Sequence, residues 1–153
     1  MSTMRNFETF DDVIFFAIES EIQSVEFYKR LSEAALESET KSFFTRLKEE
    51  EEDHIVRLQY LIDHQEELSF IPLNHHFSDE DYLSYIIPSP DVNIIECLVI
   101  AIQKEKAAMR LYSDLAAETK NHNFNKIFLS LAAEEEMHCL KFENEYNAQI
   151  VKK

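Results

Sequence analysis

The sequence contains no glycine, where average usage would give about eleven in a chain of this length. Loops that cradle phosphates, the dinucleotide-binding turn and the nucleophile elbow of hydrolases all require glycine, so these three kinds of site are excluded. Tight β-hairpins also depend on glycine in their turns, which disfavours an all-β fold. The only prolines, Pro72, Pro88 and Pro90, fall in one central stretch. The remainder of the chain is therefore predicted to be mostly helical.

Positive charge is also scarce. Lysine and arginine together number 15 against 30 aspartates and glutamates, which gives a net charge of −15. Such a chain repels phosphate backbones and anionic membrane surfaces, so we expect neither a nucleic-acid nor a membrane partner. No apolar run approaches the roughly 20 residues of a membrane-spanning helix. Cys97 and Cys139 are isolated from each other, which is typical of a reducing compartment, and we expect a cytoplasmic protein.

An internal repeat emerges when the sequence is shifted by 84 residues, with no gap needed. Most of the identities fall on apolar or ionisable residues. They are Ala17/Ala101, Ile18/Ile102, Glu21/Glu105, Tyr28/Tyr112, Leu31/Leu115, Phe44/Phe128, Leu47/Leu131, Glu50/Glu134, Glu51/Glu135, Glu52/Glu136 and His54/His138.

Each copy of the repeat is predicted to form a helical hairpin. The helices are expected over 10–36, 41–67, 90–119 and 124–149, with short polar turns between the members of each pair. Thr9 with Asp12 is typical of a helix start, and Ser89 followed by Pro90 predicts the start of the third helix.

A crossover over 68–89 joins the two hairpins, which span about 10–67 and 90–149. Residues 78–81 could cap a short helix within it, as far as Ile86. Neither hairpin could bury its apolar stripe alone, so residues 1–153 are predicted to form a single all-α domain, a four-helix bundle. If the two halves are related by a two-fold axis across the bundle, the helices run up-down-down-up and the crossover spans the length of the bundle.

The apolar stripe of each predicted helix is interrupted at mid-length by ionisable residues. In the helix over 41–67, for example, the stripe is Phe44, Leu47, Glu51, His54, Leu58 and Leu61. Residues equidistant from the turn of an antiparallel hairpin lie level with each other, and i, i+3 spacing puts each Glu-x-x-His pair on one helix face. All six groups converge if the hairpins pack core to core. They are Glu21, Glu51 and His54 in the first copy and Glu105, Glu135 and His138 in the second.

Four carboxylates in one dry layer require cations, because burial disfavours their charged form. Two divalent ions would neutralise four negative charges. A single Glu-x-x-His is common by chance in Glu-rich helices, but two of them with two further glutamates at matched heights favour a two-metal site. Carboxylate and imidazole donors suit iron or manganese, and the absence of thiolate ligands argues against structural zinc.

These motifs resemble those of the ferritin-like di-iron carboxylate proteins, most closely the rubrerythrin-like branch, in which two helices each give a Glu and two give Glu-x-x-His. The strings from Glu21 to Tyr28 and from Glu105 to Tyr112 carry the likeness, together with the two Glu-x-x-His pairs. The resemblance implies a ferritin-like four-helix bundle with two iron ions, manganese or a mixed pair remaining open. It implies that Glu51 and Glu135 bridge the metals, that Glu21 and Glu105 are terminal ligands, and that His54 and His138 bind one metal each.

Two tyrosines lie seven residues after a predicted ligand, Tyr28 after Glu21 and Tyr112 after Glu105. They share the ligand's helix face, so we expect them to hydrogen-bond to the ligand groups. The resemblance also implies an external electron donor. Rubrerythrins carry a rubredoxin-like iron site built from four cysteines, and the two separated cysteines here cannot form one.

The leading hypothesis for function is an oxidoreductase that reduces peroxide or O2 with electrons from that donor. The alternative is an iron-binding or ferroxidase-type iron-handling protein without catalytic turnover. Phe15, Phe16, Phe27 and Phe43 fall outside the stripes and widen the apolar faces, which predicts a homodimer.

Overall fold

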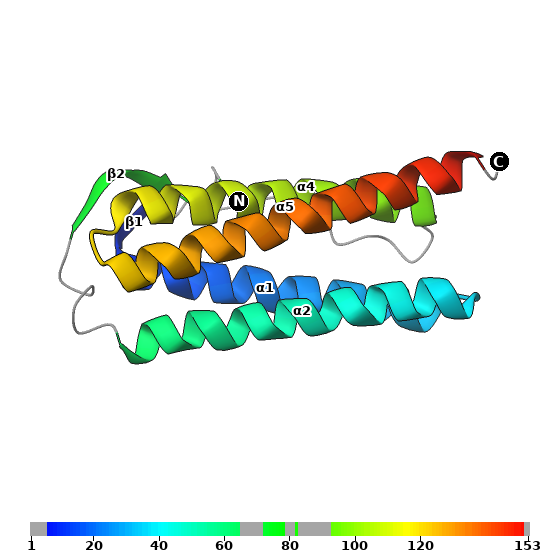
Figure 1. Ribbon diagram of the computed structural model, residues 1–153, viewed down its shortest axis with the longest axis horizontal. Coiled ribbons are helices and arrows are strands. Elements are labelled where there is room, and N and C mark those ends of the chain that lie inside the picture. The colour runs from blue at the N-terminus through cyan, green and yellow to red at the C-terminus, as the bar shows by residue number, and fades with distance from the viewer. Residues whose placement is uncertain (1–5, 65–71, 79–81, 83–92, 152–153) are drawn as a thin grey trace. The chain divides into compact units, whose positions relative to one another are not determined.

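The computed structural model describes residues 6–64, 72–78, 82 and 93–151, and four long helices account for most of them (Figure 1). The helices are α1 (Phe10–Ala34), α2 (Ser38–Asp63), α4 (Ile94–Glu118) and α5 (His122–Val151). Two short strands, β1 (Asn6–Thr9) and β2 (Pro72–Ser78), pair in a two-stranded sheet. None of the described helices has the length and apolar character that a membrane span requires.

The chain divides into two compact units, each built on one helical hairpin. The first unit, Asn6–Phe77, contains α1 packed on α2, and the second, from Ser78 onward, contains α4 packed on α5. The predicted hairpins are thus confirmed, although α2 ends at Asp63 rather than at residue 67. His64 leaves the helical conformation there, with φ −112° and ψ 24°, and its ring stacks on that of Tyr60 at 4.0 Å between centroids.

The helices repeat with the same offset as the sequence. The bounds of α4 are those of α1 moved by 84 residues, and α5 begins 84 residues after α2. The C-caps also correspond: Ala35 and Thr119 are both extended, and each donates its backbone N–H to the carbonyl four residues earlier at 3.1 Å. Because the chain leaves both helices in an extended conformation, these turns need no left-handed residue. Indeed no described residue has a positive φ, which explains how the fold manages without glycine.

The N-terminus of α1 is the one that the sequence predicts. Thr9 Oγ1 accepts a hydrogen bond from the Asp12 N–H at 3.3 Å, and the Asp12 carboxylate accepts from the Thr9 N–H at 3.4 Å, completing a capping box. The predicted start of α4 at Ser89 is wrong, because Asn93 is extended there and its side chain accepts from the Glu96 N–H at 2.9 Å. The short helix suggested up to Ile86 lies outside the described residues, apart from Ser78 in β2 and Tyr82.

The core of the first unit lies between α1 and α2. The six buried residues of α2 are the six of its predicted stripe. The buried residues of α1 include Phe16, which the sequence places outside the stripe: β1 packs there, and the Phe7 ring lies 5.2 Å from that of Phe16. The strands themselves were not expected from the sequence, and Phe77 of β2 is fully buried with them. Pro72 is the first residue of β2, a position at which strands tolerate proline.

The core of the second unit lies between α4 and α5. Phe128, Leu131 and Phe142 of α5 are fully buried, as are Leu98 and Leu115 of α4. The one described residue between β2 and Asn93 belongs to this unit: Tyr82 is buried, and its hydroxyl donates to the Asp114 carboxylate at 2.6 Å.

We predict that Thr9→Ala destabilises the protein by about 1 kcal/mol, because the first turn of α1 loses its capping oxygen. Urea unfolding followed by circular dichroism measures the change. Thr45→Ala is the matched control, since Thr45 lies inside α2 and its hydroxyl donates to the Lys41 carbonyl at 2.8 Å without capping a helix. Equal losses in both variants would contradict the capping role.

Candidate metal centre

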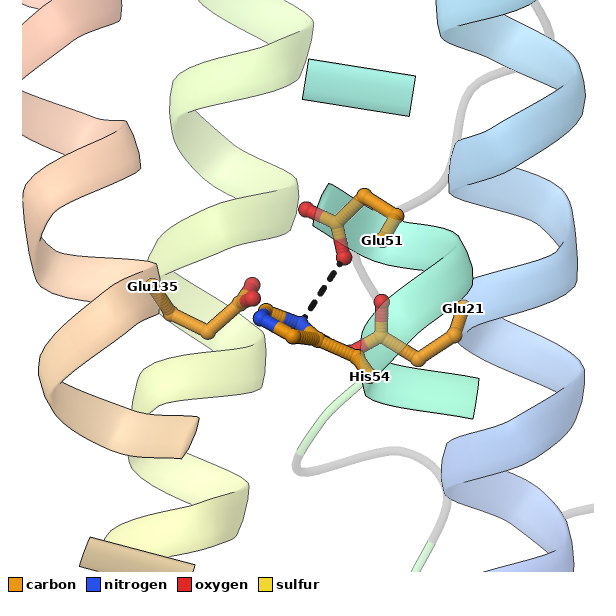
Figure 2. A group of neighbouring side chains, drawn as sticks. All are labelled: Glu21, Glu51, His54 and Glu135. Atoms are coloured by element: carbon orange, nitrogen blue, oxygen red, sulfur yellow. Dashed lines mark ion pairs between the residues drawn. The ribbon is translucent and has the colours of Figure 1, made fainter. Parts of the chain in front are cut away.

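The first unit buries three ionisable side chains together. Glu21 projects from α1, and Glu51 and His54 project from one face of α2 (Figure 2). Their exposures are 3%, 0% and 0%. The His54 Nδ1 atom lies 3.1 Å from Glu51 Oε2 and 3.6 Å from Glu21 Oε1. Three of the predicted ligands are therefore assembled within one hairpin.

The second unit repeats this arrangement. Glu105 lies on α4, and Glu135, which Figure 2 also labels, shares a face of α5 with His138. All three are at most 2% exposed. The His138 Nδ1 atom lies 3.6 Å from Glu105 Oε2 and 3.8 Å from Glu135 Oε1. The remaining three predicted ligands are thus assembled in the second hairpin, on equivalent helix positions.

The donor atoms in each hairpin are spaced as ligands of one ion would be. Two atoms bound at about 2.1 Å to the same ion lie about 3.0 Å apart at a right angle and about 4.2 Å apart on opposite sides. The four distances between imidazole and carboxylate, 3.1 to 3.8 Å, fall inside that interval. Two carboxylates and one imidazole also form a donor set that suits iron or manganese. Each hairpin therefore offers three suitable ligands for a metal ion.

His54 carries the charge balance of its hairpin when no metal is bound. Burial alone lowers the pKa of His54, but the carboxylates of Glu21 and Glu51 raise it to about 10. An imidazolium therefore partly compensates two buried carboxylates at neutral pH. Because a metal ligand must be the neutral imidazole, metal binding here displaces a proton.

Two tyrosines and one cysteine lie on the same helices as the candidate ligands. Tyr28 and Tyr112 are almost fully buried on the same helices as Glu21 and Glu105, while their hydrogen bonds to the ligands stay a prediction. Cys139 follows His138, but its Sγ lies 4.0 Å from the Ile102 carbonyl, and burial together with the Glu105 carboxylate raises the pKa of the thiol to about 12. Among the residues that the structure describes, Cys139 is not one of the side chains gathered closely enough to hold an ion.

The six residues predicted as ligands lie in the groups of side chains that could hold an ion. Within residues 6–64, 72–78, 82 and 93–151, the only His, Cys, Asp and Glu side chains gathered closely enough to hold an ion are the six predicted ones. Their role as ligands stays a prediction, which rests on the i, i+3 pairs and the repeat.

Comparisons with known proteins agree with this description. The family model described as Rubrerythrin matches residues 12–146. A solved structure of a hypothetical protein from Pyrococcus furiosus matches with a TM-score of 0.74 and 23% identity, over 92% of this chain and 90% of its own. The comparison with curated proteins finds no match. The family and the shared fold identify the chain as an all-α, ferritin-like four-helix bundle.

The raised pKa of His54 predicts how the metal-free protein responds to pH. The folded-state pKa of about 10 exceeds the unfolded value of 6.5. The stabilisation from protonated His54 is therefore complete below the unfolded value and disappears as the pH rises through the folded value. We expect the melting temperature of the chelator-treated protein to decrease as the pH is raised from 7 to 10. The decrease should be smaller in the His54→Gln variant, which lacks the titrating imidazole.

The control is His64→Gln, which changes an exposed histidine at the end of the same helix. It should leave the pH dependence of the melting temperature unchanged. A slope in His54→Gln equal to that of the unmodified protein would refute the assignment.

Proposed function

Because the chain belongs to the rubrerythrin family, we propose that its two buried carboxylate–histidine sets hold two iron ions and that the loaded protein reduces peroxide or O2 with electrons from an external donor. One observation carries this proposal. Each hairpin buries a glutamate from its first helix with a Glu-x-x-His pair from its second, at distances that suit metal ligation.

The residues of the chain contribute binding, orientation and exclusion of water. Glu21, Glu51 and His54 are on rigid helices and almost completely buried, so the donor atoms are held in place before metal arrives, and solvent is kept from the ion. Two ferrous ions held by these residues would supply one electron each, and these two electrons, with two protons taken up from solvent, convert one peroxide to two waters. The bridging roles implied for Glu51 and Glu135 stay a prediction.

Renewed turnover requires electrons that the described residues do not store. Both cysteines are free thiols and buried, and two of them fall short of the four thiolates of a rubredoxin-like site. A separate reductase or electron carrier is therefore part of the proposal.

The acidic surface supports a second candidate, an iron-handling protein without turnover. The chain has a net charge of −15. On α2, Glu49 is exposed near the buried ligands, while Glu52 and Asp53 pair with Lys48 at 3.5 Å and Arg57 at 2.9 Å. Such a field raises the local concentration of cations. A protein of this kind would oxidise iron in excess of two ions per chain or release it unchanged.

We predict that the di-ferrous protein consumes about one peroxide per two irons in a rapid phase and then stops until an electron donor is added. Glu51→Gln and Glu135→Gln should abolish the rapid phase, because each removes a charged ligand, and should lower iron affinity by at least about tenfold. Stopped-flow absorbance follows the oxidation, and competition with a chelator gives the affinity.

The chain provides matched controls for these variants. Glu52→Gln and Glu136→Gln remove the next carboxylate along each helix, which is exposed rather than buried, and should leave the stoichiometry and rate unchanged. Continued iron oxidation beyond two per chain, with no response to any donor, would reject the oxidoreductase in favour of iron handling.

A further inference from the structure

The side of α5 opposite its core carries an apolar stripe that the metal centre does not use. Leu129, Met137 and Leu140 are 53%, 55% and 50% exposed, and Ala133 between them is exposed as well. At 100° per residue these four side chains fall within about 80° of one another, and Leu131 and Phe142 of the core point the other way. We call Leu129, Ala133, Met137 and Leu140 the outer stripe.

The repeat shows that this stripe is not required by the fold. The residues 84 positions earlier, on the outer side of α2, are Thr45, Glu49, Asp53 and Val56. The inner faces of the two helices carry the same ligands, whereas three of the four outer positions change from polar on α2 to apolar on α5. A helix of the same architecture is therefore stable with a polar outer side, and the apolar one on α5 needs another explanation.

Charge is balanced around the outer stripe, in contrast to the chain as a whole. Lys126 and Lys141 lie on α5 with Glu134, Glu136 and Glu143. Glu143 is also 3.9 Å from Lys106 of α4, so three lysines accompany three glutamates. Two copies of a chain with a net charge of −15 repel each other over most of their surface. The outer stripe combines apolar area with local neutrality, so copies can meet here without opposing uncompensated carboxylates.

We propose that the outer stripe is the surface on which a second copy of this chain docks, with the two α5 helices antiparallel. A two-fold axis near residues 134–135 places Leu129 opposite Leu140 of the other copy and the small Ala133 within one residue of the level of its long Met137. It also brings Lys126 level with Glu143 of the other copy. A parallel pair would instead oppose each residue to itself, placing lysine beside lysine and methionine against methionine.

The length of α5 gives the contact sufficient extent. With the axis near 134–135, residues 122–147 of each copy overlap, a stretch of about 39 Å. The four apolar residues form its centre, and the charged residues beside them form a polar rim, the usual anatomy of a specific interface.

This surface differs from the one that the phenylalanine content suggests. Phe16 and Phe27 are buried within their own unit, at 4% and 7% exposure, with their rings in contact with Phe7 and Tyr28. Phe43 is partly buried beside Phe44, which leaves only Phe15 of the four more than half exposed. The expectation that these four phenylalanines widen exposed apolar faces is therefore wrong for Phe16 and Phe27, and the surface for a partner lies on α5.

Light scattering of the full chain at micromolar concentration tests the proposal. The unmodified protein should have about twice the 18.1 kDa mass of one chain, and Leu140→Glu should have the mass of one chain because it places a carboxylate against Leu129 of the other copy. Val56→Glu is the matched control, since Val56 is the equivalent position on α2 and is 65% exposed; it should leave the mass doubled. A monomeric unmodified protein, or a Leu140→Glu variant of unchanged mass, would overturn the proposal.

Crosslinking under mild oxidation tests the orientation. The variant with both Leu129→Cys and Leu140→Cys should form a covalent dimer on a non-reducing gel, whereas each single variant should remain a monomer there. The native Cys97 and Cys139 are buried and should give no background. Efficient crosslinking of either single variant would show a parallel pair, and failure of the double variant would exclude this contact.

Discussion

The burial of charged groups in the two helical cores is the constraint on which the rest of the structure depends. Each hairpin places two carboxylates and an imidazole where a helical bundle normally has leucine. Buried carboxylates that lack a compensating cation cost several kcal/mol each. Either a proton on the imidazole or a metal ion can supply the positive charge, and the pKa of His54 shows how strongly its carboxylates demand one. The apolar residues above and below, such as Leu47 and Leu58, provide the stability that offsets this cost.

The two copies of the internal repeat are alike on the inner sides of α2 and α5 and differ on the outer sides of these helices. On the inner sides of α2 and α5, the ligand chemistry restricts the choice, and the residues coincide: Glu51 with Glu135 and His54 with His138. On the outer sides nothing in the hairpin restricts the choice, and Asp53 corresponds to Met137. The identities between the repeats therefore include the buried candidate ligands and core residues such as Phe44 and Phe128, whereas the outer sides of α2 and α5 differ at most positions.

The sequence predicted most of the fold and all of the candidate ligands, because both depend on local spacing. The stripe of α2 was predicted residue by residue, since a helix that packs on one side leaves a clear period. The start of α4 was not predicted correctly. Ser89-Pro90 is a good start signal in isolation, but the N-cap of α4 is Asn93, the residue that the repeat aligns with the N-cap Thr9 of α1. The strands were missed because β1 has only four residues, too few for an alternating pattern to stand out. Nor does the stripe of α1 reveal that β1 covers Phe16, because that contact depends on tertiary structure.

The pairing of β1 with β2 bears on the order in which the first unit folds. From an unfolded chain, joining residues 6–9 to residues 72–78 closes a loop of about 60 residues, which costs about 3–4 kcal/mol in chain entropy. Once α1 and α2 have closed on their short turn, the start of α1 and the end of α2 lie at the same end of the hairpin (Figure 1). Only the segment between His64 and Pro72 then remains to be closed, at about half that cost. The helices should therefore form early through local contacts, and the sheet should be the last part of the unit to assemble.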